Sequence, residues 1–266
     1  MKTILKFIGF LFLFVLLTVI TQIGGIVLFF SLFFSKLWKK DFKFKKTVTF
    51  IILYLIATLF ITPYVSPFFG REKILNTSKI KPSNYMYVLL NRNYVRPALN
   101  KLLKQTQHDL VDTGIEIRYL DANFPFINNF PLLPHLSHND GKKLDLSLVY
   151  KSNNDKITTK QKSVSGYGVF ESPKGNEYNQ INVCFKKGFY QYDHQKYMTF
   201  GKINKALIFS KKGTKKLINS LLKNKTLGKL FIEPHLKHRL NLTNPKIRYH
   251  GCRAVRHDDH IHIQLK

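Results

Sequence analysis

Cysteine is scarce in this chain of 266 residues, which contains only Cys184 and Cys252. Two thiols are too few for the all-thiolate clusters that form many structural zinc sites. An oxidising compartment would allow the two side chains to form a disulfide. Their proximity in space does not follow from the sequence, so a disulfide and two separate thiols are both open alternatives.

Acidic residues are also few, with 15 Asp and Glu against 43 Lys and Arg, which gives a formal net charge of +28. The basic residues are scattered along the chain, and no nucleic-acid-binding motif accompanies them, so we expect no nucleic-acid partner. Such a surface suits anionic lipid headgroups or an anionic cell-wall polymer. A solvated basic surface without a specific partner is the simpler interpretation.

Two familiar hydrolase motifs are missing. The sequence has no H-E-x-x-H, which excludes the zincin arrangement of a helical metal site. It has no G-x-S-x-G, so a serine nucleophile on a strand-to-helix elbow has little support. No internal repeat is present. Any catalytic site must therefore be built from other residues.

Charged residues almost disappear from two apolar runs, 4–34 and 48–65. The first exceeds the roughly 20 residues that a helix needs to cross a bilayer, and the second is near the minimum. A cleaved signal peptide would have an apolar core of about 7–15 residues and a small-residue cleavage site, neither of which is found. The two runs predict two transmembrane helices.

A lysine-rich loop at 36–46 separates these predicted helices. Basic loops stay in the cytoplasm, so the chain after about Pro67 is expected on the outer side of the membrane. The sequence therefore predicts a membrane anchor at 1–70, a linker at 71–83 and an extracytoplasmic domain at 84–266.

The predicted domain mixes helical and strand patterns without a regular βαβ repeat. This favours an α+β fold, with a small antiparallel sheet and flanking helices. A Gly/Ser/Pro-rich segment, 163–176, predicts a long flexible stretch near a working surface. Helices are expected at 88–111 and 202–222, and strands at 115–120, 144–150, 230–233 and 260–265.

The strand expected at 260–265 carries two histidines. Ile261, Ile263 and Leu265 alternate with polar residues, so His260 and His262 project from the same face. Paired imidazoles beside carboxylates are suitable ligands for a transition metal.

Further candidate ligands lie upstream. Asp145 begins a predicted strand, and Gly141 permits a tight turn that brings His138 over it. With His262 they would supply two nitrogens and one carboxylate oxygen, leaving a fourth tetrahedral position for water. This arrangement is typical of a catalytic zinc, which lowers the pKa of a bound water toward about 7.

Together these motifs resemble the zinc peptidases that cut cell-wall peptides, a group that includes D-Ala-D-Ala carboxypeptidases and dipeptidases. The similarity is greatest to the penicillin-insensitive murein endopeptidases, and it covers roughly 84–266. Two further family histidines, three positions before each motif, are present as His135 and His257. The motifs themselves are Ser137-His138-x-x-Gly141-x-x-x-Asp145 and His260-x-His262.

The resemblance implies that His138, Asp145 and His262 are zinc ligands and that His260 is the general base. It implies that His135 and His257 line the site. The expected activity is zinc-dependent cleavage of peptidoglycan peptide cross-links, at the periplasmic side of a bacterial inner membrane. The alternatives are a D,D-carboxypeptidase or dipeptidase on the same scaffold and a non-catalytic module that binds wall peptides.

Asp259 is the rival for the role of base, because some relatives place an acidic residue three before the last ligand. In a regular strand it would point away from His260 and His262, so we rank it second. It could instead orient an imidazole.

Overall fold

The computed structural model describes Met1 and residues 3–266 in full, and Lys2 only as part of a helix. The chain forms two compact units, each assembled from several segments. The first contains Met1–Ile74, Met86–Arg96 and Asn123–Gly141, and the second contains Leu75–Tyr85, Pro97–Ala122 and Lys142–Lys266. Two segments of the predicted extracytoplasmic domain thus group with the N-terminal helices.

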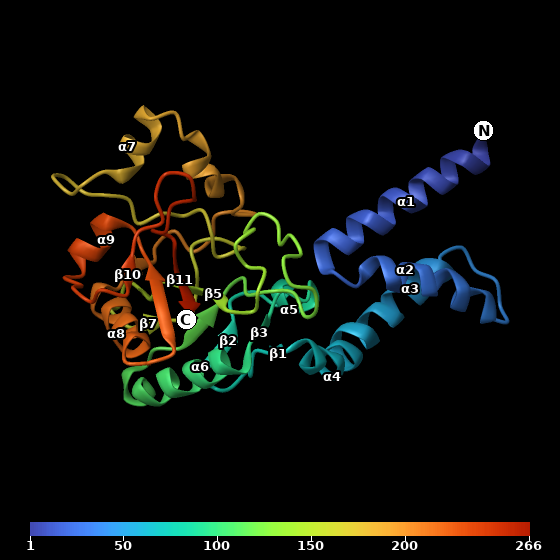
Figure 1. Ribbon diagram of the computed structural model, residues 1–266, viewed down its shortest axis with the longest axis horizontal. Coiled ribbons are helices and arrows are strands. Elements are labelled where there is room, and N and C mark those ends of the chain that lie inside the picture. The colour runs from blue at the N-terminus through green and yellow to red at the C-terminus, as the bar shows by residue number, and fades with distance from the viewer. The chain divides into compact units, whose positions relative to one another are not determined.

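The first unit is mainly helical (Figure 1). Two stretches, Thr3–Thr21 and Lys45–Phe69, are long and apolar enough to cross a membrane, and a shorter apolar helix, Gly24–Leu37, separates them. The elements are α1 (Lys2–Thr21), α2 (Gly24–Phe34), η1 (Ser35–Leu37), α3 (Lys45–Ile56), η2 (Ala57–Ile61), α4 (Thr62–Val65), η3 (Ser66–Phe69), β1 (Glu72–Lys73), α5 (Met86–Leu89) and β3 (Tyr94–Val95).

The prediction of one continuous span over 4–34 is wrong, because the helix breaks at Gln22, whose φ is 67°. The Thr21 hydroxyl accepts the Gly24 N–H at 2.8 Å, which satisfies a donor at the start of α2. A Cβ on Gly25 would lie 2.1 Å from the Thr18 hydroxyl, so only glycine allows α2 to fold back against α1. At about 1.5 Å per residue, α2 is too short to span a bilayer of roughly 30 Å.

Arg71 ties the loop 123–141 to the end of the helical stretch. Its buried guanidinium donates to the Phe124 carbonyl, to Asn128 Oδ1 at 2.7 Å and to the Asn139 carbonyl at 3.0 Å. These contacts hold both ends of a loop that has little regular structure of its own.

The second unit is built on a six-stranded sheet in the order β10-β9-β11-β5-β4-β2. The sheet is mixed, and the prediction of an antiparallel sheet is wrong in this respect. β4 runs parallel to β2, and β10 runs parallel to β9, because α6 and α9 carry the chain back across the sheet between the paired strands. The strands are β2 (Ile80–Pro82), β4 (Ile117–Tyr119), β5 (Lys143–Ser147), β9 (Leu227–Phe231), β10 (Ile247–Arg248) and β11 (His260–Leu265).

Helices accompany this sheet, and the fold is mixed α/β with small sheets, as the alternating patterns indicated. A three-stranded sheet contains β6 (Tyr150–Lys151), β7 (Ile157–Thr158) and β8 (Ile208–Phe209). The helices are α6 (Pro97–Asp109), η4 (Val111–Thr113), α7 (Gln180–Lys186), η5 (Tyr190–Tyr197), α8 (Lys211–Leu222) and α9 (Pro234–Arg239).

Both predicted helices in this domain begin later than expected. α6 begins at Pro97, which suits the first helical turn because its missing N–H needs no partner there. α8 begins after Ser210, whose hydroxyl accepts the Gly213 N–H at 3.1 Å, and the residues before it form β8.

A disulfide joins Cys184 of α7 to Cys252, with the two Cα atoms 5.2 Å apart. This resolves the alternative that the sequence left open. Cys184 packs with Ile181 and Tyr192 in a small buried cluster. The link attaches α7 to the segment that leads into β11.

Candidate metal centre

The register between two central strands brings Asp145 and His262 together. β11 pairs antiparallel with β5, and His262 lies directly opposite Asp145. The His262 Nδ1 and the Asp145 Oδ1 are 2.7 Å apart, and both side chains are buried. The backbone of Asp145 is held on the other edge of β5, where its N–H donates to the Asp121 carbonyl at 2.9 Å.

The third candidate ligand is His138. A tight turn positions it, in which the His138 N–H donates to the His135 carbonyl at 2.9 Å. Ligand atoms of His138, Asp145 and His262 all lie within 4.8 Å of one another, and all three residues are buried. Two imidazole nitrogens and one carboxylate oxygen at this separation fit a divalent transition metal and leave one tetrahedral position open.

His260 lies beside this cluster. It precedes His262 by two residues on β11, so both side chains are on the same face of the strand. Its Nε2 is 3.7 Å from Asp145 Oδ1, and its Nδ1 is 2.5 Å from Asp259 Oδ1. Burial lowers the pKa of His260, but the carboxylates of Asp145 and Asp259 outweigh burial and raise it to about 9. One ring nitrogen therefore faces the ligands while the other is held by a carboxylate.

Asp259 does not sit within the regular strand, since β11 begins at His260. Its side chain therefore does not follow the strand alternation that would turn it away. One carboxylate oxygen contacts the His260 ring, and the other accepts the Gly168 N–H at 2.6 Å. This geometry gives Asp259 the position of an orienting partner for His260.

Tyr167 is a buried residue of the site that the sequence patterns did not identify. Its hydroxyl donates to Asp145 Oδ2 at 2.7 Å and accepts the Asp121 N–H at 3.1 Å. Its ring meets the His260 ring edge-on, with the centroids 5.0 Å apart. The signal available in the sequence was its place in the Gly/Ser/Pro-rich segment 163–176, which does reach the site.

Two more histidines lie next to β11. His257 is buried, with its ring centroid 4.8 Å from that of His260. Burial lowers its pKa well below the ordinary value, and the neighbouring His260 lowers it further, so His257 is neutral at pH 7. His250, which no motif marked, stacks on His257 with the centroids 5.2 Å apart and lies 5.8 Å from His262.

His135 is the remaining predicted residue. It is buried, and its ring centroid is 5.7 Å from that of His138, which follows it in the same turn. The two rings are tilted with respect to each other. His135 therefore neighbours a candidate ligand without belonging to the three-residue cluster.

A buried polar network supports the segment before β11. The Arg256 guanidinium contacts both carboxylate oxygens of Asp258, at 2.7 and 2.5 Å, and Asp193 Oδ1 at 2.9 Å. Glu233 accepts the His257 N–H at 2.9 Å and the Tyr192 hydroxyl at 2.6 Å. Burial and the Asp258 carboxylate raise the pKa of Glu233 to about 7.

The arrangement could hold a divalent metal with a titratable imidazole beside it. That imidazole is His260, which the Asp259 carboxylate contacts at 2.5 Å. No known family model matches the chain, and no curated protein matches its sequence. The interpretation of the site therefore rests on its own geometry and on the sequence motifs.

Proposed function

We propose that this protein is a membrane-anchored, zinc-dependent peptidase that cleaves the peptide cross-links of peptidoglycan. The observation that carries the proposal is the convergence of His138, Asp145 and His262 within 4.8 Å, with His260 next to them on β11. The resemblance of both motifs to penicillin-insensitive murein endopeptidases supports the choice of substrate.

In this proposal His138, Asp145 and His262 hold the metal. Zinc at such a site would supply a Lewis acid for the scissile carbonyl and would lower the pKa of water. Tyr167 donates to the second oxygen of Asp145, so it fixes which carboxylate oxygen faces the two imidazoles. The three ligands come from buried, hydrogen-bonded positions, which reduces the cost of ordering them when metal binds.

His260 acts as the general base in this proposal. Its Nδ1 contacts Asp259 and its Nε2 lies on the side of Asp145. Asp145 is one of the carboxylates that raise the pKa of His260 to about 9, and a bound cation would offset the charge of Asp145, so that Nε2 would be free to accept a proton. His135 and His257 line the site. The neutral state of His257 avoids a second positive charge beside the cation.

Two further observations support a location at the inner membrane with the peptidase site on the periplasmic side. The stretches Thr3–Thr21 and Lys45–Phe69 are apolar enough to anchor the chain in a bilayer. The disulfide between Cys184 and Cys252 is a feature of oxidising compartments outside the cytoplasm.

The test uses the full-length protein in detergent micelles, with added zinc or with a chelator. Muropeptides are incubated with each sample, and the products are identified by mass spectrometry. Zinc-dependent loss of cross-linked dimers is the expected result. Loss of terminal D-alanine alone would instead indicate a carboxypeptidase, and binding of muropeptides without any product would indicate a non-catalytic module.

Two variants assign the roles, and an exposed histidine provides the control. His262→Ala should lose stoichiometric zinc, whereas His260→Ala should keep zinc and lose activity. His108→Ala, an exposed substitution on α6, should change neither property. A His262→Ala protein that still bound one zinc ion would contradict the ligand assignment.

A further inference from the structure

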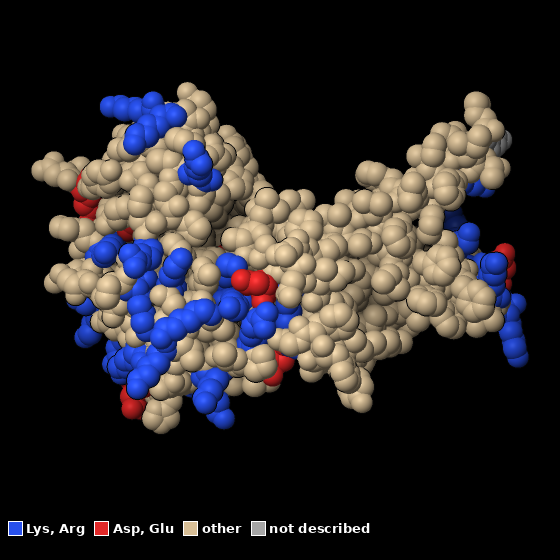
Figure 2. Space-filling model, viewed as in Figure 1, with Lys and Arg blue, Asp and Glu red and all other residues tan. Residues whose placement is uncertain are grey.

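One helix of the second unit has a strongly basic face. The exposed or half-buried positions of α8 carry lysine almost without exception, while Leu217, Ile218 and Leu221 are fully buried against the core. Figure 2 shows Lys and Arg side chains gathered over the region where Figure 1 places α6 and α8. The lysines of this face are Lys211, Lys212, Lys215 and Lys216, and Lys223 follows directly after the end of the helix.

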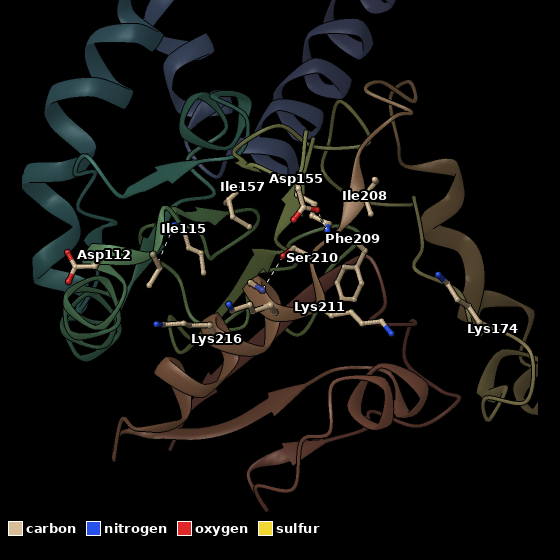
Figure 3. A pocket seen from close by; sticks show the side chains of 14 residues that line it. Asp112, Ile115, Asp155, Ile157, Lys174, Ile208, Phe209, Ser210, Lys211 and Lys216 are labelled. Carbon is tan, nitrogen blue, oxygen red and sulfur yellow. Dashed lines mark hydrogen bonds and ion pairs between the residues drawn. The ribbon is translucent and has the colours of Figure 1, made fainter. Parts of the chain in front are cut away.

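The largest of three hollows beside α8 has a volume of about 840 Å³. Lys211, Lys212 and Lys216 line it from α8, and Lys151 and Lys174 line it from other segments. Figure 3 shows Lys216 and Lys174 on opposite sides of the view. Its acidic lining residues are Asp112 and Asp155, and Asp155 forms an ion pair with Lys151, so the balance of charge in the hollow is positive.

Two more hollows follow along the same helix, with volumes of about 410 and 450 Å³. The first shares Lys212 and Lys216 with the large hollow and adds Lys215, Lys223 and Asp109, and Asp109 forms an ion pair with Lys223 at 2.9 Å. The second is lined again by Lys215 and Lys223, together with residues of the loop 241–244. Because neighbouring hollows share their lysines, they form a continuous basic track along α8.

We propose that this track binds a linear phosphate polymer, with successive charges of one chain occupying successive hollows. Lysine is a flexible point charge, whereas rigid recognition of one phosphate usually employs the forked guanidinium of arginine. Exposed lysines spaced over several turns attract a partner that carries many charges, since each contact alone is weak in water. This surface is independent of the metal centre and of the peptidase proposal.

The shape of the track favours a polymer over a flat anionic membrane. Its lysines line separate depressions between α8 and several neighbouring segments, whereas a flat bilayer surface contacts mainly groups that lie in one plane. The two smaller hollows include no aromatic side chain among their described lining residues. Single-stranded nucleic acids are usually held by stacking of successive bases on several aromatic rings, whereas Phe209 of the large hollow is the one aromatic among the described residues that line the track.

The experiment measures binding of long-chain inorganic polyphosphate to the full-length protein in nanodiscs of neutral lipid, over a series of salt concentrations. The test variant combines Lys212→Gln, Lys215→Gln and Lys216→Gln. The matched control removes the same charge elsewhere in the unit, by Lys186→Gln, Lys187→Gln and Lys205→Gln, all exposed in the native protein. Circular dichroism confirms that both variants are folded.

We expect the test variant to bind more weakly and its slope of log affinity against log salt to fall by about 2, at roughly 0.7 for each removed contact. The control variant should retain the native slope. Equal losses in both variants would reduce the effect to net charge and overturn the proposal. So would native binding by the test variant.

Three additional probes identify the partner. Inorganic phosphate should compete poorly, because a single charge fills one hollow. Vesicles of anionic lipid and an oligothymidine should bind less tightly than polyphosphate at equal phosphate concentration. A preference for either the vesicles or the oligothymidine, abolished by the triple substitution, would overturn the assignment to a phosphate polymer.

Discussion

The Nδ1 of His262 and the Oδ1 of Asp145 lie 2.7 Å apart across the antiparallel pair of β11 and β5. Two groups in this position can share a cation, since both present lone pairs to the same space once the imidazole is neutral and carries its proton on Nε2. In the proposed function the contact also fixes the side of the sheet on which His260 acts. The predictions below follow from this arrangement and from the groups that support it.

Replacing His260 separates proton transfer from metal binding. His260→Ala removes the proposed base but leaves all three ligands, so we expect kcat to fall by about 10²–10⁴-fold with zinc content unchanged. Turnover of muropeptides and metal analysis of the same sample check this. Full activity in the variant would exclude His260 as the base.

Tyr167→Phe tests the support of Asp145. Loss of the hydroxyl removes the donor to Asp145 Oδ2, so zinc affinity should fall by about 10–100-fold. A competition titration with a fluorescent chelator measures the change. Tyr178→Phe, at a side chain that is 57% exposed, serves as the control and should bind zinc like the native protein.

Glu233 should make stability depend on pH. Its pKa is about 7 in the folded protein and near 4.5 when unfolded, so the folded state holds the proton more tightly. The contribution of Glu233 to the free energy of unfolding should therefore be greatest below about pH 4.5 and should be lost as pH rises through 7, by up to roughly 3 kcal/mol.

The measurement is denaturant unfolding of the native protein and of Glu233→Gln in detergent at several pH values. The difference between the two curves isolates this one carboxyl from the others that titrate nearby. A difference that does not change between pH 4.5 and 7 would contradict the assignment.

The disulfide between Cys184 and Cys252 closes a loop with a sequence separation of 68. A crosslink of this length stabilises the fold mainly by restricting the unfolded chain, by about 4 kcal/mol. The double variant Cys184→Ser and Cys252→Ser should therefore unfold at a clearly lower temperature. Scanning calorimetry measures the midpoint temperature of unfolding. An unchanged midpoint in the double variant would show that the disulfide contributes little to stability.

Local patterns predicted the part of the site that depends on alternation. His260 and His262 share a face because a strand repeats every two residues, and the structure places both at the proposed site. Tyr167 and His250 could not be found in this way. Each reaches the site through the path of a loop, and loop paths depend on tertiary contacts such as the Gly168 N–H bond to Asp259.

The apolar N-terminal run illustrates the same limit. Hydropathy identified a segment suited to lipid, but it did not reveal the break at Gln22. That break depends on the close approach of Gly25 to Thr18, which is a contact between two helices. The mean hydropathy of the segment carries no information about such a contact. The parallel strand pairs of the sheet were missed for a related reason, since parallel pairing is set by crossover helices.

The pairing of His262 with Asp145 joins positions 117 residues apart in the chain. Contacts between residues so far apart in the chain form slowly. The long intervening segment must lose conformational entropy before the contact can stabilise the fold. In an unfolded chain the candidate ligands are not held together, so the chain binds metal weakly. Binding of the proposed metal should therefore follow the docking of β11 between β5 and β9, so that a partly folded chain carries no assembled site.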